Sequence, residues 1–139
     1  MISIIFLILA SICNSVMDVC SFHYSTSIFS KLNPKFWDST ISWKNKYVDW
    51  DGGDKRRRKW IFGLFNYPVQ LTDSFHLFKT LMIIFICISI SVFDCDLLSI
   101  ISSKEIRTIT IIGIYGTSWN VIFSAFYNYI FVIKKSSKQ

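Results

Sequence analysis

Residues 72–93 read TDSFHLFKTLMIIFICISISVF, and this stretch decides the class of the protein. A helix needs about 20 mostly apolar residues to cross a hydrocarbon core about 30 Å thick, and this run supplies them. Its first turns carry Asp73, His76 and Lys79, whose ionisable side chains are costly inside a membrane. The stretch therefore predicts a membrane-spanning helix with a polar cluster at one end.

The composition of the whole chain agrees with a membrane protein. Hydrophobic residues make up 52% of the 139 residues, and the mean hydropathy is +0.42. A soluble domain of this length has too little interior to bury so much apolar surface. We expect an all-α protein with one membrane domain over residues 1–139. Its spans should lie near 2–22, 74–93 and 108–133, and a basic, aromatic-rich loop should cover 23–73.

Charge predicts the orientation of these spans. Nine of the fifteen basic residues lie between Lys31 and Lys59, and Lys134, Lys135 and Lys138 end the chain. Because cytoplasmic segments carry an excess of Lys and Arg, we expect this loop and the C-terminal tail in the cytoplasm and the N-terminus outside. The charge adjoins hydrophobic spans, which favours anionic lipid rather than nucleic acid as its partner.

Aromatic and basic residues alternate in the long loop. This mixture suits a segment that lies on the membrane surface, with rings in the headgroup zone and ammonium groups on phosphates. We expect contact with anionic headgroups at the cytoplasmic face from Trp43, Lys44, Lys46, Arg56, Arg57, Arg58 and Lys79. The alternative is a solvated loop whose charges only set the topology. Residues 60–71 contain Pro68 and are too short to span, so they should lie at the interface.

Four ionisable residues should meet at the cytoplasmic face. Asp18 and His23 end the first span, and Asp73 and His76 begin the second. Asp73 and His76 are three residues apart and share one helix face. Because carboxylates buried among helices need partners, we expect at least one Asp–His pair between the two spans.

This cluster allows two kinds of chemistry. Asp18, His23, Asp73 and His76 could ligate a divalent metal that lowers the pKa of a bound water. Without a metal, each His–Asp pair could act as a general base, which makes the same four residues catalytic candidates. The structural alternative is that Thr72 is the N-cap of the second span and Asp73 favours the helix dipole. We expect no resident cofactor, with a divalent metal as the open alternative.

Four short motifs carry a resemblance to a known family. They are MDxxxxHYxxS at 17–27, FW at 36–37, SWKNKY at 42–47 and LTDSFHLFK at 71–79. In these motifs the chain resembles a family of small integral membrane proteins of gut bacteria and their phages. The resemblance covers residues 15–80 and includes the Asp/His cluster. It implies the bacterial cytoplasmic membrane as the location and no particular activity.

Two classes of function remain open. The first is assembly in the membrane through protein or lipid contacts, with holin-like topology and self-association as one form. Small residues of the third span, Gly113, Gly116, Ser118 and Ala125, should let a neighbouring helix approach closely. The second is a small membrane-embedded enzyme that acts on a lipid or lipid phosphate with the Asp/His cluster. No P-loop, HExxH or nucleophile-elbow motif occurs in the sequence to favour an enzyme.

Overall fold

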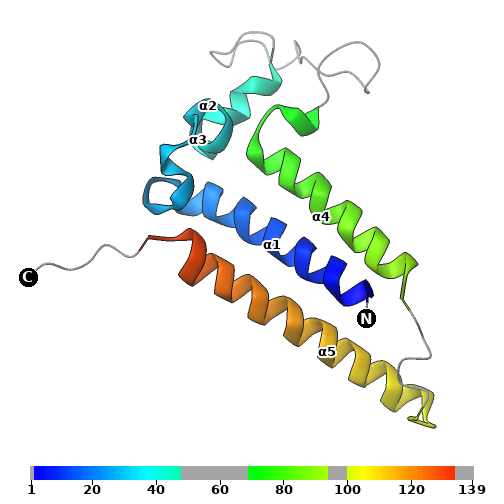
Figure 1. The fold of residues 1–139 in the computed structure, drawn as a ribbon. Coiled ribbons are helices and arrows are strands. Elements are labelled where there is room, and N and C mark those ends of the chain that lie inside the picture. The colour runs from blue at the N-terminus through cyan, green and yellow to red at the C-terminus, as the bar shows by residue number, and fades with distance from the viewer. Residues whose placement is uncertain (1, 48–68, 94–99, 134–139) are drawn as a thin grey trace, which may run out of the picture.

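The computed structural model describes residues 2–47, 69–93 and 100–133 of the chain (Figure 1). Its three long helices are α1 (Ile2–Phe22), α4 (Ser74–Ser91) and α5 (Lys104–Ala125), and a π-helical turn, η6 (Phe126–Phe131), continues α5. Each is long and apolar enough to cross a membrane, with η6 counted in the third span. The described residues contain no strand, so the prediction of an all-α, three-span membrane protein is confirmed.

Short helical turns fill the described part of the chain between α1 and α4. They are η1 (Tyr24–Thr26), η2 (Ile28–Lys31), α2 (Pro34–Trp37), α3 (Ser39–Ser42), η3 (Trp43–Lys46) and η4 (Val69–Leu71). Three of them have side-chain caps. Ser27 Oγ accepts from the Phe29 amide at 3.2 Å, Asn33 Oδ1 from the Lys35 amide at 3.0 Å, and Asp38 Oδ1 from the Thr40 amide at 2.9 Å. Capping lets helices of only four residues hold their first turn.

The helices lie close to the predicted spans, with the bounds 2–22 for α1 and differences of a few residues for the other two. Helix α4 ends at Ser91 rather than at residue 93. The third span runs over Lys104–Phe131 rather than 108–133. It begins early because Ser103 is an N-cap, whose Oγ accepts from the Ile106 amide at 3.3 Å. The first turn is polar, so hydropathy alone does not detect it.

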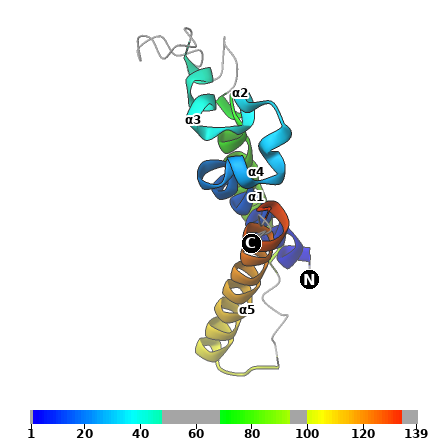
Figure 2. The ribbon, with the colours of Figure 1, turned by 90° about the vertical axis from the view of Figure 1, so that its left-hand side faces the viewer.

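Helix α1 lies between α4 and α5 (Figures 1 and 2). Helix α4 runs antiparallel to α1, whereas α5 runs parallel to it, so the start of α4 and the end of α5 lie beside the C-terminal end of α1 (Figure 1). Within the apolar stretch of each span, 44% of α1 is buried, against 11% of α4 and none of the third span. Helix α1 therefore contributes most of the buried residues of the bundle.

Serine hydroxyls join α1 to α5. Ser11 Oγ donates to the Trp119 carbonyl at 2.9 Å, and Ser15 Oγ donates to the Phe123 carbonyl at 3.2 Å. The two serines are four residues apart, as are their two acceptors, so parallel helices keep this register along their length. Small residues at such positions let helix backbones approach closely in a membrane.

A second set of hydroxyls joins all three spans near the N-terminus of α1. Ser89 Oγ of α4 donates to the Ser3 carbonyl at 2.7 Å, and the hydroxyl of Ser3 hydrogen-bonds to that of Tyr115 on α5. Ser3 and Ser89 are both buried. The polar atoms of these side chains are thus satisfied inside the bundle, as the hydrocarbon around it requires.

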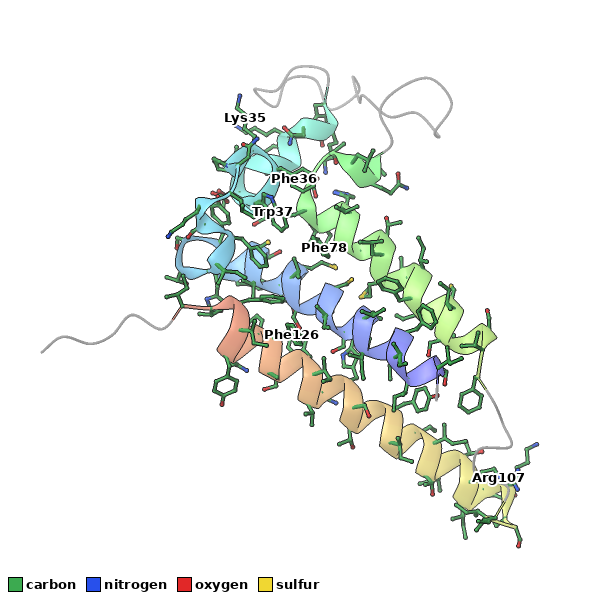
Figure 3. The ribbon with its side chains drawn as sticks, in the orientation of Figure 1. Lys35, Phe36, Trp37, Phe78, Arg107 and Phe126 are labelled. Atoms are coloured by element: carbon green, nitrogen blue, oxygen red, sulfur yellow. The ribbon has the colours of Figure 1, made fainter. Side chains whose placement is uncertain are left out.

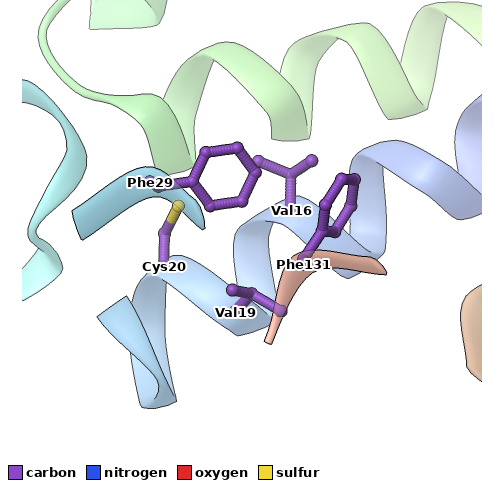
Figure 4. Packing of buried hydrophobic residues seen from close by; sticks show 5 residues of the cluster. All are labelled: Val16, Val19, Cys20, Phe29 and Phe131. Atoms are coloured by element: carbon purple, nitrogen blue, oxygen red, sulfur yellow. The ribbon is translucent and has the colours of Figure 1, made fainter. Parts of the chain in front are cut away.

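An apolar cluster closes the other end of the bundle. Its buried members are Val16, Val19, Cys20, Phe29 and Phe131 (Figure 4). Trp37 stacks on Phe29 with ring centroids 4.9 Å apart and also contacts Phe78 of α4 at 5.9 Å (Figure 3). Through this cluster the short helices after α1 pack against the ends of all three spans.

The α1–α5 contact predicts the effect of enlarging a serine. Ser11 is fully buried against α5, so Ser11→Leu should overpack the interface and remove a hydrogen bond, which destabilises the fold by about 1–3 kcal/mol. Ser91→Leu is the control, because Ser91 is exposed and donates only within α4, to the Cys87 carbonyl. Unfolding in mixed micelles would measure both changes. Equal stabilities of the two variants would contradict the α1–α5 packing.

Candidate functional site

Asp73 is the N-cap of α4. Its backbone is extended, with φ −158° and ψ 165°, and its Oδ1 accepts from the His76 amide at 2.9 Å. The prediction that Thr72 is the cap is wrong, because the Thr72 hydroxyl lies instead 2.8 Å from the Val69 carbonyl and 3.0 Å from Asp73 Oδ2. Asp73 is only 2% exposed, so these bonds replace water around a buried carboxylate.

The imidazole of His76 completes this arrangement. His76 Nδ1 lies 2.9 Å from Oδ1 and 2.8 Å from Oδ2 of Asp73. A carboxylate can only accept, so Nδ1 carries a proton in either charge state of the ring, and in the neutral form Nε2 is left as an acceptor. The His76 side chain is 30% exposed, so the pair lies at the surface of the bundle. Such a pair has the tautomer that a general base or a metal ligand requires.

The environment of Asp73 stabilises its charged form. Burial raises the pKa of the carboxyl, but the bonds from the His76 ring and amide, the His76 charge and the Thr72 hydroxyl together outweigh burial. The net pKa of Asp73 therefore lies below its ordinary value. Asp73 belongs to the end of the span rather than to its interior, where such a charge would be far more costly.

The loop before α4 holds this site in place. Asn45 Nδ2 donates to the Thr72 carbonyl at 2.8 Å and to the Lys35 carbonyl at 2.5 Å. Ser74 Oγ donates to the Trp37 carbonyl at 3.5 Å. These bonds join the start of α4 to the SWKNKY stretch and to α2, so the motif residues around the pair have a structural role.

The structure brings Asp73 and His76 together, but their contact is within α4. Helix α1 does end at Phe22, and the His23 ring packs edge-on against Tyr127 of η6 with centroids 5.4 Å apart. Asp18 is half-buried on α1 and makes no hydrogen bond to either histidine. The prediction of an Asp–His pair between the two spans is therefore wrong, because the nearest partner of each carboxylate depends on helix rotation, which spacing does not fix.

No three His, Cys, Asp or Glu side chains of residues 2–47, 69–93 and 100–133 lie close enough to hold a metal together. Asp18, His23, Asp73 and His76 thus form one local pair and two separate side chains. The metal and the catalytic role of these residues stay predictions.

The expected headgroup residues are partly described. Trp43 is 39% exposed on η3, with Lys44 Nζ 5.9 Å from the centre of its ring, and Lys46 Nζ lies 5.5 Å from the ring of Tyr47. Lys79 Nζ lies 5.9 Å from the ring of Phe75 on α4. Arg56, Arg57, Arg58 and most of the expected interfacial segment 60–71 lie outside the described residues. The alternation of basic and aromatic residues thus forms ring–ammonium pairs.

The structural serines of α1 were not predicted from the sequence. Ser3 and Ser11 bond to α5. The available signal was the four-residue spacing of Ser11 and Ser15, which places two small hydroxyl residues on one face.

Comparisons with known proteins return no match: no protein-family model matches the chain, and neither the curated proteins nor the solved structures contain a match to it.

The lowered pKa of Asp73 predicts a pH-dependent stability. A carboxyl whose folded pKa is depressed stabilises the fold above its unfolded value of about 3.9, and that contribution is lost as the pH falls through the folded pKa. Asp73→Asn keeps a capping side chain but loses the charge, so it should be about 1–2 kcal/mol less stable than wild type at pH 7. The difference should disappear toward pH 2.

The measurement is the free energy of unfolding in detergent between pH 7 and pH 2. Asp38→Asn is the matched control, because Asp38 is the N-cap of α3 and has no histidine partner. A difference between wild type and Asp73→Asn that stays constant over this range would contradict the stabilised carboxylate.

Proposed function

We propose that this chain is a small multi-pass membrane protein that acts by assembling with other helices in the membrane. One observation carries the proposal. The third span, Lys104–Phe131, has the lowest mean hydropathy of the three, 1.4 against 1.8 and 2.1, and none of its apolar stretch is buried within the chain. A monomer in lipid should expose its most apolar helix and not its least apolar one.

The physical reason is the solvent. Lipid tails offer no hydrogen bonds, so polar side chains of spanning helices face protein or water-filled space. Association of spanning helices depends on close packing and on hydrogen bonds between polar side chains. A span with outward polar groups is therefore suited to a helical partner.

We place the long loop and the C-terminal end of the third span at the cytoplasmic face, and the N-terminus outside. The described residues 23–47 of the loop, the start of α4 and the end of α5 lie at one end of the bundle (Figure 1). A cytoplasmic position of this end suits the basic residues of the loop and of the C-terminal tail. This orientation and the three spans are holin-like. The partners of the basic end in this proposal are anionic headgroups.

The second candidate is a membrane-embedded enzyme for a lipid or lipid phosphate. The Asp73–His76 pair favours it, because the carboxylate orients the imidazole with Nε2 free of that bond. We rank assembly above the enzyme because helix capping is a sufficient role for Asp73. Its Oδ1 accepts from the His76 amide in the first turn of α4, where amides have no partner within the helix, and its Oδ2 accepts from the Thr72 hydroxyl.

Assembly is tested by counting subunits. The fluorescently labelled full chain, reconstituted at low density in bilayers, should bleach in two or more steps per spot. His76→Ala should give the same count, because the pair belongs to the cap and not to the assembly surface. Single-step bleaching of wild type would contradict the proposal, and metal bound to wild type but lost in His76→Ala would favour the enzyme.

The lipid contact is tested at the aromatic-basic turn. The double variant Lys44→Gln/Lys46→Gln should bind phosphatidylglycerol about thirtyfold more weakly than wild type in native mass spectrometry, because each of the two lysines contributes about 1 kcal/mol. Lys104→Gln, at the opposite end of the bundle, is the control. Unchanged retention in the double variant would contradict a headgroup role for these lysines.

A further inference from the structure

A polar stripe lies on the face of α5 that points away from α1. Its members, here called the α5 outer stripe, recur every three or four residues and are all exposed: Gly113, Thr117, Asn120, Ser124 and Asn128. This spacing places them on one helix face. The face toward α1 is instead formed by Trp119 and Phe123, which accept the serine bonds of α1.

The stripe is exposed in the described part of the chain, with open space at its glycine. A Cβ added at Gly113, or at the adjacent exposed Gly116, would meet nothing within 4 Å. Neither α1 nor α4 uses this space, so the close approach of a neighbouring helix at these glycines stays a prediction. They lie on the outer side, where only a helix from outside the described bundle could use the space.

The amides in the stripe are incompletely bonded. Asn120 Nδ2 donates to the Gly116 carbonyl at 2.8 Å, and Asn128 Nδ2 donates to the Ser124 carbonyl and hydroxyl at 3.1 Å. A carboxamide has two N–H groups and an oxygen that accepts twice, so these local bonds use only part of its capacity. Asn120 lies deep in the span, about 17 Å from the nearer end at 1.5 Å per residue.

The outer face of α4 differs sharply from that of α5. Its exposed residues between Thr80 and Ser91 are Ile83, Ile84, Cys87 and Ile90. Such a surface suits lipid tails and needs no partner. The bundle therefore has one outer side suited to lipid and one suited to protein.

An apolar groove adjoins the stripe. It measures about 540 Å³ and is lined by Ile8, Gly113, Ile114, Thr117, Ser118, Val121 and Ile122. Gly113 and Thr117 belong to both the groove and the stripe. A helix seated on the stripe would therefore have apolar volume to fill beside its polar contacts.

A second copy of the chain fits this face by complementarity. Two copies follow the same topological signals, so their α5 helices are parallel and their residues lie at equal depth. Asn120 of one copy then meets Asn120 of the other, and each carboxamide supplies both the donor and the acceptor that its counterpart lacks. A second copy has Asn120 at the same depth because its sequence is identical, whereas a different partner would need a polar group placed there independently.

We infer that the α5 outer stripe is a homotypic interface, in which two parallel α5 helices pair through Asn120 and pack closely at Gly113, Thr117 and Ser124. This inference rests on the proposed assembly function and names its partner and surface. Asn120 provides the hydrogen bonds at the centre of the interface, and the small residues provide the close approach.

Cysteine cross-linking in membranes tests the surface directly. In the full chain with its four native cysteines replaced by alanine, Thr117→Cys and Ser124→Cys should each form disulfide-linked dimers on mild oxidation. Ile112→Cys is the matched control, since Ile112 is 65% exposed on the same helix but lies about a third of a turn away from the stripe. Equal cross-linking at 112, 117 and 124 would overturn the inference.

Asn120→Leu tests the central contact. The variant keeps a similar side-chain volume and makes the exposed face more apolar, so the monomer should insert and fold normally. Its dissociation constant in the bilayer should rise about tenfold, whereas Ser91→Leu on the exposed part of α4 should leave it unchanged. Oligomers that survive Asn120→Leu and give no cross-links at 117 or 124 would overturn this interface but keep the assembly function. Monomeric wild-type protein would overturn both.

Discussion

Hydrocarbon gives a polar side chain no water to bond with, and this constraint organises the described bundle. Helix α1 meets it by placing Ser11 and Ser15 against backbone carbonyls of α5. Helix α4 meets it by exposing mainly apolar residues between its capped start and its end. Among the described residues, helix α5 has partners from another helix for its polar groups only on the face toward α1. The same rule that accounts for the packing inside the bundle therefore identifies the surface that the bundle leaves incomplete.

At the end of the bundle the constraint is relaxed, and charged groups appear where water and headgroups can reach them. The Asp73 carboxylate is buried, yet it has bonds from Thr72 and His76 and caps the α4 amides. Three interactions offset the free-energy cost of burying this carboxylate. It caps the helix, it bonds to the imidazole of His76, and its negative charge is favourable at the helix N-terminus. The aromatic cluster around Trp37 and Phe29 then covers the junction with apolar contacts.

The sequence predicted the existence of the spans better than their contacts. Length and hydropathy are properties of one segment, so three spans could be read from the chain. The start of the third span was missed because Ser103 caps a polar turn that hydropathy excludes. The Asp73–His76 pair could be predicted because the two residues are three apart on one helix. Asp18 and His23 do not join this pair, because their directions depend on the rotation of α1 and on the contact of His23 with Tyr127 of η6. The direction of Gly113 likewise depends on which face of α5 meets α1, which only the packing decides.

The energies on the two faces of α5 are of unequal size. Hydrogen bonds between spanning helices contribute about 0.6 kcal/mol each on average, so the three hydroxyl contacts from Ser3, Ser11 and Ser15 amount to about 2 kcal/mol. An amide without partners in an apolar medium costs about 4–8 kcal/mol, and the local bond of Asn120 to Gly116 removes only part of that cost. The outer face thus has at least as much to gain from a partner as the inner face gains from α1. Helix α5 is thus held against α1 by hydrogen bonds of modest energy. Its least satisfied polar side chain, Asn120, lies on the opposite face. This arrangement is expected of a span that binds a further helix.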